Sequence, residues 1–346
     1  MNFSKALLQW YLQNKRDLPW RNTTNPYHIW LSEIMLQQTR VAQGLPYFLR
    51  FIDAFPTIFD LAKAHEEQVL KLWQGLGYYS RARNLHKTAQ QIAFEFDGVF
   101  PNNFLNLLKL KGIGEYTAAA IASFSFNESV PVVDGNVFRV LSRYFDIGTD
   151  ISSSAAKKEF TALANELLPK GSANLFNQAI MEFGALQCVP KNPDCENCVL
   201  NQSCLALQRK KVAQLPVKLK KTKVTKRYFN YLIFIDDNQN TLIQKRTDKG
   251  IWHNLYEFPL IETENPETDE VILKLIQSQK IITNPLQDEN IVASERIIHK
   301  LSHQHLNIKF WKVAVSGTIQ GGINSELAMK FPFPIVIFNF IENEGF

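Results

Sequence analysis

Cysteine is missing from this chain of 346 residues except in one short window. Elsewhere no cysteine is left to build a disulfide framework, and the N-terminal residues form no long apolar run of the kind found in secretory signals. The window holds all four cysteines in the spacing Cx6Cx2Cx5C: Cys188, Cys195, Cys198 and Cys204. Four thiolates so close together indicate a zinc or iron–sulfur site, with a pair of disulfides as the alternative.

The sequence also lacks any apolar stretch long enough to cross a bilayer, which argues against an integral helical membrane protein. Its length is comfortable for two or three domains, each able to bury a core of its own. We therefore expect a cytoplasmic protein that makes no membrane contact. The missing targeting segment fits a bacterial cytoplasm.

Acidic residues are absent from residues 209–227, which hold nine Lys or Arg. The whole chain has 38 basic and 33 acidic residues and a formal charge of +5. Outside the basic segment, 29 basic residues face the same 33 acidic ones, so the remainder is net negative. A general positive field is thereby excluded, and any contact with nucleic acid must come from local patches.

The sequence divides into two parts with different hydrophobic patterns. Up to about residue 208, apolar residues recur at intervals of three and four, which predicts helices broken at Pro56, Gly75, Pro101 and Gly112. From residue 228 the chain predicts strands at 228–236, 240–246, 306–315 and 333–338, with one helix at 269–280. A helical half is thus joined to an α+β half by the basic segment.

Two motifs in the helical half carry possible chemistry. Gly112 and Gly114, in LKLKGIGEYTAAAIASF, allow a tight turn that aims free amides from a helix N-terminus, which suits a DNA phosphate. A turn between packed helices with no ligand is the alternative. Asp134, in VPVVDGNVF, precedes another predicted helix, where an aspartate is often no more than an N-cap.

The order of these motifs and the cysteine window resembles the endonuclease III superfamily of base-excision glycosylases. Four stretches narrow the resemblance to the MutY type of adenine DNA glycosylase: RDLPWR (16–21), WLSEIMLQQTRV (30–41), GLGYYSRARNLH (75–86) and FNQAIMEFGALQC (176–188). The resemblance implies an all-α helix-hairpin-helix glycosylase core with an iron–sulfur loop, followed by an α+β Nudix-like domain.

The resemblance also implies domain boundaries. Residues 1–208 would form the catalytic region, in which 22–130 is a six-helix module and 1–21 with 131–208 is a cluster module. The basic linker would cover 209–227, and the Nudix-like domain 228–346.

Glu33 is the lone carboxylate on an otherwise apolar helix, so burial should raise its pKa into the range of an acid that works near neutral pH. A solvent-facing glutamate is the alternative. The resemblance makes Glu33 the proton donor to N7 of adenine and the activator of water. It makes Asp134 the carboxylate that stabilises the sugar cation or bonds to it, and Asn136 a supporting donor.

Tyr116 separates two relatives. In the lyase branch of the superfamily, a lysine two positions after the second hairpin glycine forms a Schiff base with the sugar. A phenol forms no imine, so we expect a monofunctional glycosylase, although Lys109 and Lys111 lie just upstream. The alternatives are a glycosylase-lyase of the endonuclease III type acting on oxidised pyrimidines, and a lesion binder with no catalysis.

The target base must be flipped out of the duplex to be reached. The resemblance assigns intercalation to Gln37, Gln38 and Thr39, with Gln37 one helical turn after Glu33, and a wedge beside the lesion to Tyr78. It lines the adenine pocket with Arg16, Trp20, Arg21 and Glu182. Ordinary exposed glutamines and an ordinary packed tyrosine are the alternatives.

For the four cysteines, the resemblance implies a [4Fe-4S] cluster that shapes the DNA contact and takes no part in hydrolysis. In the C-terminal half, LIQKRTDKGIWHNLYEFP (242–259) resembles the Nudix-like reader, without the glutamate-rich box of a working Nudix hydrolase. Ser302 and His303 would recognise 8-oxoguanine, with Leu301 where the family has an aromatic residue. A metal site at His299, His303 and His305 is the alternative.

The expected partner is double-stranded DNA with 8-oxoguanine:adenine or guanine:adenine mispairs. We expect a monomer that associates with the nucleoid when it is bound to DNA.

Overall fold

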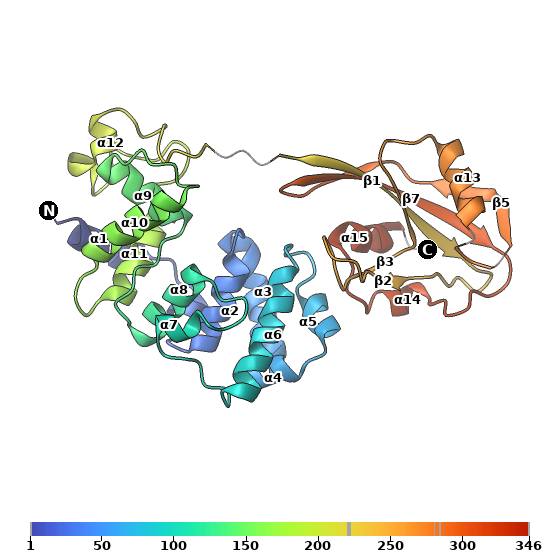
Figure 1. The fold of residues 1–346 in the computed structure, drawn as a ribbon, viewed down its shortest axis with the longest axis horizontal. Helices are drawn as coiled ribbons and strands as arrows, with labels where there is room; N and C mark the ends of the chain where they lie inside the picture. The colour runs from blue at the N-terminus through green and yellow to red at the C-terminus, as the bar shows by residue number, and fades with distance from the viewer. Residues whose placement is uncertain (1, 220–222, 280, 284, 345–346) are drawn as a thin grey trace. The chain divides into compact units, whose positions relative to one another are not determined.

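The computed structural model describes residues 2–219, 223–279, 281–283 and 285–344 (Figure 1). The chain divides into two compact units. Unit 1 comprises Met1–Lys63 and Asn84–Lys220, and unit 2 comprises Ala64–Arg83 and Lys221–Phe346. Among the described residues, no helix has the length and apolar character needed to span a membrane.

Unit 1 is helical, as the sequence predicts. Its helices are α1 (Phe3–Asn14), α2 (Pro26–Leu36), α3 (Val41–Ala54), α4 (Ile58–Lys63), most of α6 (Ser80–Glu95), α7 (Phe104–Leu107), α8 (Glu115–Phe126), α9 (Gly135–Phe145), α10 (Ser154–Leu167), α11 (Ala173–Leu186) and α12 (Leu205–Gln208). Two short 3-10 turns, η1 (Pro19–Arg21) and η2 (Asn201–Ser203), complete it.

One core of unit 1 joins segments that are far apart in the sequence. Leu7 and Trp10 of α1 are buried with Leu141 of α9 and Phe183 of α11. The rings of Trp10 and Phe183 meet edge to face, with their centroids 5.0 Å apart. This apolar packing fixes the first helix against α9 and α11, and Arg16, just after α1, reaches Glu182 of α11.

The hairpin before α8 is fixed by its neighbours. Gly112 adopts a left-handed conformation with φ of +77°. The Thr88 hydroxyl of α6 donates to the carbonyl oxygen of Lys111, and α8 starts directly after its N-cap, Gly114. The hairpin therefore presents the N-terminus of α8 beside the buried helix α2.

Unit 2 is built on a mixed sheet in the order β4-β1-β7-β5, with β6 also paired to β7. Its strands are β1 (Thr225–Ile235), β4 (Leu260–Thr263), β5 (Leu286–Ala293), β6 (Ile297–Lys300) and β7 (Gln304–Val315). β1 and β7 are parallel, and the other pairs are antiparallel. A small second sheet pairs β2 (Gln244–Lys245) with β3 (Tyr256–Glu257).

Helices pack against both faces of the larger sheet. Ile272 of α13 (Asp269–Gln279) packs on one face with Trp311. On the other face, Phe340 of α15 (Ile335–Glu344) stacks on Phe310, with ring centroids 3.9 Å apart. Because Phe310 and Trp311 are adjacent on β7, their side chains point to opposite faces. The short helix α14 (Ser325–Ala328) lies between β7 and α15 in the sequence.

Helix α5 (Glu66–Leu72) and the loop after it group with unit 2, although the sequence analysis places them in the helical region. Asn254 donates to Glu66 at 2.5 Å, and the hydroxyl of Tyr256 donates to Glu67 at 2.8 Å. Lys245 forms an ion pair with Glu67 at 2.9 Å. These polar contacts connect residues almost two hundred positions apart.

Two predictions of secondary structure were wrong. Residues 333–338 were predicted as a strand, but α15 begins within them at Ile335, because Val336, Ile337, Phe340 and Ile341 recur at helical spacing and are buried after Pro334. The strand predicted at 240–246 is reduced to the two residues of β2 and one bridge from Thr241 to Ile323. The helix predicted at 269–280 is confirmed over Asp269–Gln279 as α13, and residue 280 lies outside the described residues.

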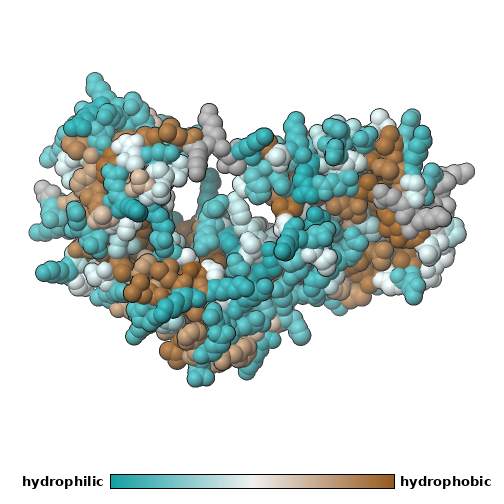
Figure 2. Space-filling model, viewed as in Figure 1, coloured by the Kyte–Doolittle hydropathy of each residue, from teal (hydrophilic) through white to brown (hydrophobic). Residues whose placement is uncertain are grey.

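Most of the face in view in Figure 2 is hydrophilic, with scattered hydrophobic patches. Exposed apolar side chains of unit 1 include Phe94, Val99 and Leu105.

Gly112→Ala should lower the free energy of unfolding by about 1–3 kcal/mol, because an L-residue is strained at positive φ. The added Cβ would also lie 2.9 Å from the Cβ of Asn84. Gly114→Ala is the matched control, because its Cβ would meet no atom within 4 Å. Urea denaturation of both variants would test this, and equal losses would contradict it.

Candidate active site

Three helices of unit 1 place polar side chains around one cavity of about 580 Å³. α2 supplies Glu33, α8 supplies Tyr116, and the N-terminus of α9 supplies Asp134. Nine residues singled out in the sequence lie together in its lining: Arg16, Trp20, Arg21, Glu33, Thr39, Tyr116, Asp134, Asn136 and Glu182. The cavity thus gathers residues from motifs more than a hundred positions apart.

Glu33 is buried, with 7% of its surface exposed. Burial raises the pKa of its carboxyl group, the hydrogen bond from Tyr116 lowers it, and the nearby Asp134 carboxylate raises it again, so that the pKa is about 7. The Tyr116 hydroxyl donates to Oε2 of Glu33 at 2.5 Å. Glu33 can therefore hold a proton near neutral pH and still release it, as expected from its apolar helix.

Asp134 caps α9 and also faces the cavity. Its Oδ1 accepts from the backbone N–H of Val137 at 2.8 Å, and its Oδ2 accepts from the side-chain amide of Asn136 at 2.7 Å. Burial raises the pKa of Asp134, while these hydrogen bonds act to lower it. The capping role and a chemical role are therefore compatible, because the cap holds the carboxylate in a fixed orientation.

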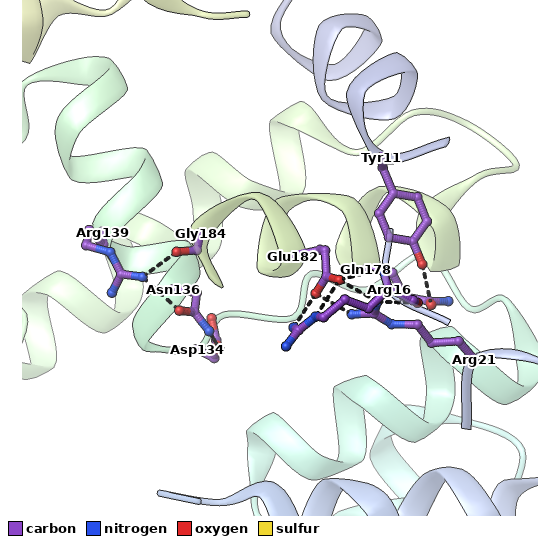
Figure 3. A network of polar contacts seen from close by, with 9 residues as sticks. All are labelled: Tyr11, Arg16, Arg21, Asp134, Asn136, Arg139, Gln178, Glu182 and Gly184. Atoms are coloured by element: carbon purple, nitrogen blue, oxygen red, sulfur yellow. Dashed lines mark hydrogen bonds and ion pairs between the residues drawn. The ribbon is translucent and has the colours of Figure 1, made fainter. Parts of the chain in front are cut away.

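Glu182 lies between two arginines (Figure 3). Arg16 and Arg21 each approach both of its carboxylate oxygens, at 2.6–2.9 Å. Burial alone would raise the pKa of Glu182, but the hydrogen bonds from Arg21 and Arg16 lower it to about 2. Two guanidinium groups facing one carboxylate leave this wall of the cavity with a net positive charge.

Sequence reasoning missed Gln178, which also lines the cavity. Its side-chain oxygen accepts from the hydroxyl of Tyr11 at 3.0 Å (Figure 3). Gln178 lies four residues before Glu182 on α11 and so occupies the same face of the helix. That spacing, in FNQAIMEFG, is the signal that could have identified it.

Arg139 was also missed, and it links the cavity to the cysteine window. Its guanidinium donates to Oδ1 of Asn136 at 2.8 Å and to the carbonyl oxygens of Gly184 at 2.7 Å and Cys188 at 2.8 Å. Asn136 in turn donates to Asp134, as Figure 3 shows. One buried arginine therefore connects the Asp134 carboxylate to the first cysteine of the window.

The four cysteines line a second cavity, whose other walls include Val140, Phe183 and Leu200. All four are free thiols and are partly buried. Arg143 donates to the carbonyl oxygens of Val189 and Pro190 at 2.8 and 3.0 Å and lies 3.4 Å from Sγ of Cys188. The four thiols that line this cavity, beside the buried Arg143 guanidinium, are the donor type of a thiolate-bound metal cluster.

Within the described part of the chain, no three His, Cys, Asp or Glu side chains are grouped closely enough to hold a metal ion as they stand, and this includes the four thiols. The alternative of a histidine site at residues 299, 303 and 305 therefore finds no support. The His299 ring instead packs at 5.9 Å from the ring of Trp252.

Gln37 and Gln38 line a neighbouring groove of about 920 Å³, together with Gly114. The prediction that Gln37 lies on the same helix as Glu33 was wrong, because α2 ends at Leu36. Gln37 is its C-cap residue, and Gln38 has a positive φ of +55°. Leu36, Tyr116 and Asp134 line both the groove and the Glu33 cavity, so the two spaces adjoin.

Tyr78, Ser302 and His303 lie on the wall of a cavity of about 700 Å³ within unit 2. Tyr78 is 44% exposed and has a positive φ of +47°. Oγ of Ser302 lies 3.2 Å from Nδ1 of His303, and both side chains are exposed. The wedge residue and the lesion reader proposed from the sequence therefore share one cavity, with Leu301 beside them.

Family models match both halves of the chain. Residues 31–168 match the HhH-GPD superfamily of base excision DNA repair proteins, and residues 230–343 match the NUDIX domain. The second match agrees with the sheet and helices of unit 2, and the first with the helices and hairpin of unit 1.

Curated relatives share most of the chain. An adenine DNA glycosylase of Buchnera aphidicola from Schizaphis graminum is 38% identical, over 88% of this chain and 86% of that protein. A second, from the Baizongia pistaciae strain, is 35% identical over 96% and 94%. The human adenine DNA glycosylase is 44% identical over 62% of this chain and 41% of its own length.

Solved structures match the helical half. A thermostable thymine-DNA glycosylase superposes with a TM-score of 0.55 at 29% identity, over 60% of this chain and 95% of that one. An endonuclease III–DNA complex superposes with a TM-score of 0.52 at 22% identity, over 60% and 94%, which shows the shared fold.

Gly184→Ala should disturb the Asn136–Asp134 contact, because a Cβ at residue 184 would lie 2.6 Å from the Cβ of Asn136. Overpacking of this kind costs about 1–3 kcal/mol of unfolding free energy. Gly148→Ala adds the same methyl group with no atom within 4 Å and serves as the control. Chemical denaturation that finds the two variants equally stable would refute the expectation.

Proposed function

The chain belongs to the adenine DNA glycosylases of base excision repair, and we propose that its substrate is adenine mispaired with 8-oxoguanine or guanine in duplex DNA. The observation that carries the chemistry is the pair of carboxyl groups in one cavity, the buried Glu33 and the half-buried Asp134. Their surroundings differ, and the pKa of Glu33 is about 7. Two carboxyl groups with separated roles are what cleavage of a glycosidic bond requires.

The protonated Glu33 donates its proton to N7 of the flipped adenine, so that the base leaves as a neutral molecule. Glu33 is then a carboxylate and can accept a proton from the attacking water. Tyr116 supports both states, because its hydroxyl donates to Oε2 of Glu33. The neighbouring Asp134 makes a second negative charge costly and so favours the protonated acid before the reaction.

Asp134 stabilises the cationic sugar that forms as the bond breaks. The hydrogen bonds from Val137 and Asn136 favour its ionised form and fix its position. A fixed negative charge costs no reorganisation when positive charge develops on the sugar. Asn136 thus acts on Asp134 and need not touch the substrate.

The adenine base occupies the part of the cavity lined by Arg16, Trp20, Arg21 and Gln178. Both oxygens of Glu182 are engaged by the two arginines, so Glu182 holds the arginine side chains in place. The side-chain amide of Gln178 carries both a hydrogen-bond donor and an acceptor, and it can therefore pair with the acceptor and the donor on the edge of adenine.

Strand cleavage through an imine is excluded from this mechanism. The position of the lyase lysine holds Tyr116, whose hydroxyl is engaged with Glu33. A phenol cannot condense with the sugar aldehyde, so the product is an abasic site in an intact strand.

We further propose that the four cysteines bind a [4Fe-4S] cluster. The residues fit this group chemically, because four thiols are its donor set and all four line one cavity beside the Arg143 guanidinium. When bound, the cluster would join four points of residues 188–204 and supply no step of the hydrolysis. Arg143 would offset the negative charge of the thiolates, and Arg139 would connect the loop to Asp134 through Asn136.

Ser302 and His303 read the base opposite the adenine. Both offer hydrogen-bonding groups from an exposed turn between β6 and β7. The 8-oxoguanine base differs from guanine at O8 and N7–H, so polar groups at this turn can distinguish the two bases. Leu301 provides apolar contact without aromatic stacking. The distorted duplex would be contacted by Gln37, Gln38, Thr39 and Tyr78. We propose that the protein acts as a monomer in the cytoplasm.

Glu33→Gln should slow release of adenine by about 10²–10⁴-fold, because it removes the proton donor. The wild-type rate should fall as pH rises through about 7, where Glu33 loses its proton, and this descent should vanish in the variant. Single-turnover assays on an 8-oxoguanine:adenine duplex would measure both effects, with the exposed Glu166→Gln as control. An unchanged rate in Glu33→Gln would refute the mechanism.

Ser302→Ala should weaken the preference for 8-oxoguanine over guanine opposite adenine. Loss of one hydrogen bond, about 0.5–1.5 kcal/mol, corresponds to a roughly 2–10-fold loss of discrimination. Rates on the two duplexes would be compared with those of Ser278→Ala, an exposed serine of α13. A preference equal to that of the wild type would remove Ser302 from recognition.

A further inference from the structure

The cavity of unit 2 that contains Tyr78 and Ser302 is lined by basic side chains and by no acidic ones among the described residues. Four cationic side chains lie on its wall: Arg83, Arg227, Lys249 and Lys300. Two histidines, His299 and His303, lie there as well. Among the lining residues that the structure describes, none is an aspartate or glutamate. A wall with cations and no carboxylate favours a ligand that carries several negative charges.

The four cationic side chains differ in the ion pairs and hydrogen bonds that they form within the protein. Arg227 is neutralised by Glu262, which it approaches with Nε and Nη2 at 2.6 Å each. Arg83 donates from Nη1 to the carbonyl oxygen of His253 at 2.8 Å, which fixes its direction without neutralising its charge. Lys249 and Lys300 are exposed, and neither takes part in an ion pair found among the described residues.

Hydrogen bonds hold the backbone next to Tyr78 in place. The indole N–H of Trp73 donates to the carbonyl oxygen of Gly77 at 3.0 Å, and Arg81 donates to the same oxygen at 3.2 Å. The Arg81 guanidinium also lies 5.5 Å from the centre of the Tyr78 ring. The exposed Tyr78 side chain thus stands at a strained backbone position in the same cavity as Lys249 and Lys300. An aromatic ring for base stacking together with cations for phosphates is typical of a nucleic-acid binding site.

We propose that this cavity binds the phosphate backbone of the DNA strand that carries the base opposite the adenine, with Lys249 and Lys300 as its phosphate contacts. The inference rests on the proposed function, in which Ser302 and His303 read that base. Because Lys300 lies two residues before Ser302, a strand whose base reaches Ser302 brings its own phosphates to the same wall. Arg83 adds a directed donor to this wall.

A salt titration separates phosphate contacts from base recognition. The variant Lys249→Ala/Lys300→Ala should show a dependence of log Kd on log salt that is less steep by roughly 2, since each phosphate contact contributes about 0.9 to the slope. The full-length protein would be titrated with a duplex that carries a non-cleavable fluorinated adenosine opposite 8-oxoguanine or guanine. The affinity ratio between these two duplexes should stay unchanged.

The matched control is Lys274→Ala/Lys330→Ala, which removes two exposed lysines of unit 2 that do not line the cavity. If its slope falls as much as that of the first variant, the effect is one of net charge and the proposal fails. A thermal unfolding temperature close to that of the wild type would show that each double variant still folds.

Neutral methylphosphonate linkages identify the strand. Placed beside 8-oxoguanine, they should weaken binding of the wild type and have little further effect on Lys249→Ala/Lys300→Ala. If this pattern, weaker binding of the wild type with little further effect on the variant, appears only when the neutral linkages are in the adenine strand, the assignment of the strand is wrong. A wild type that binds both duplexes equally would instead overturn the proposed reading of 8-oxoguanine, while a shallower slope in the variant would still support the phosphate contacts.

Discussion

Desolvation of the Glu33 carboxyl group is the constraint on which the rest of the site depends. An apolar helix places this side chain where water cannot solvate its charge, and the pKa rises to about 7. A carboxyl group in water would be almost fully ionised at that pH and could donate no proton. Around it, Tyr116 supplies a hydrogen bond that moderates the rise, so the acid is not trapped in its protonated form.

Three carboxyl groups of unit 1, two of them buried and Asp134 half-buried, differ in pKa because their neighbours differ. Glu33 has one neutral donor and a raised pKa, whereas Glu182 has two arginines and a pKa of about 2. Asp134 lies between these cases, because the donors at the start of α9 oppose its burial. The same type of side chain thus provides a group that can hold a proton near neutral pH, an ion-paired anion and a hydrogen-bonded carboxylate. Local partners decide between them, because the desolvation cost is common to all three.

Much of this could be predicted from the sequence. The helical half, the strands β1 and β7, the acid on an apolar helix and the converging motifs all depend on local patterns. Gln178 and Arg139 could not be predicted, because their importance arises from contacts with Tyr11 and Gly184 that only the fold creates. The basic segment also misleads when it is counted as free charge: Arg209 and Lys211 pair with Asp146, and Arg227 pairs with Glu262. The wrong strand at 333–338 shows that short β-branched runs are ambiguous without their partners.

The grouping of residues 64–83 with unit 2 has a consequence for chain connectivity. The backbone passes from one unit to the other near residues 63, 83 and 220, so unit 2 is not a module simply appended to the end of unit 1. A fragment that stops at residue 220 would keep Glu66 and Glu67 but lose Lys245, Asn254 and Tyr256, the partners of those two acids. Such a truncation would remove the proposed reader of 8-oxoguanine and would also remove the contacts of a helix in the first hundred residues, so a loss of activity in that fragment would have two causes.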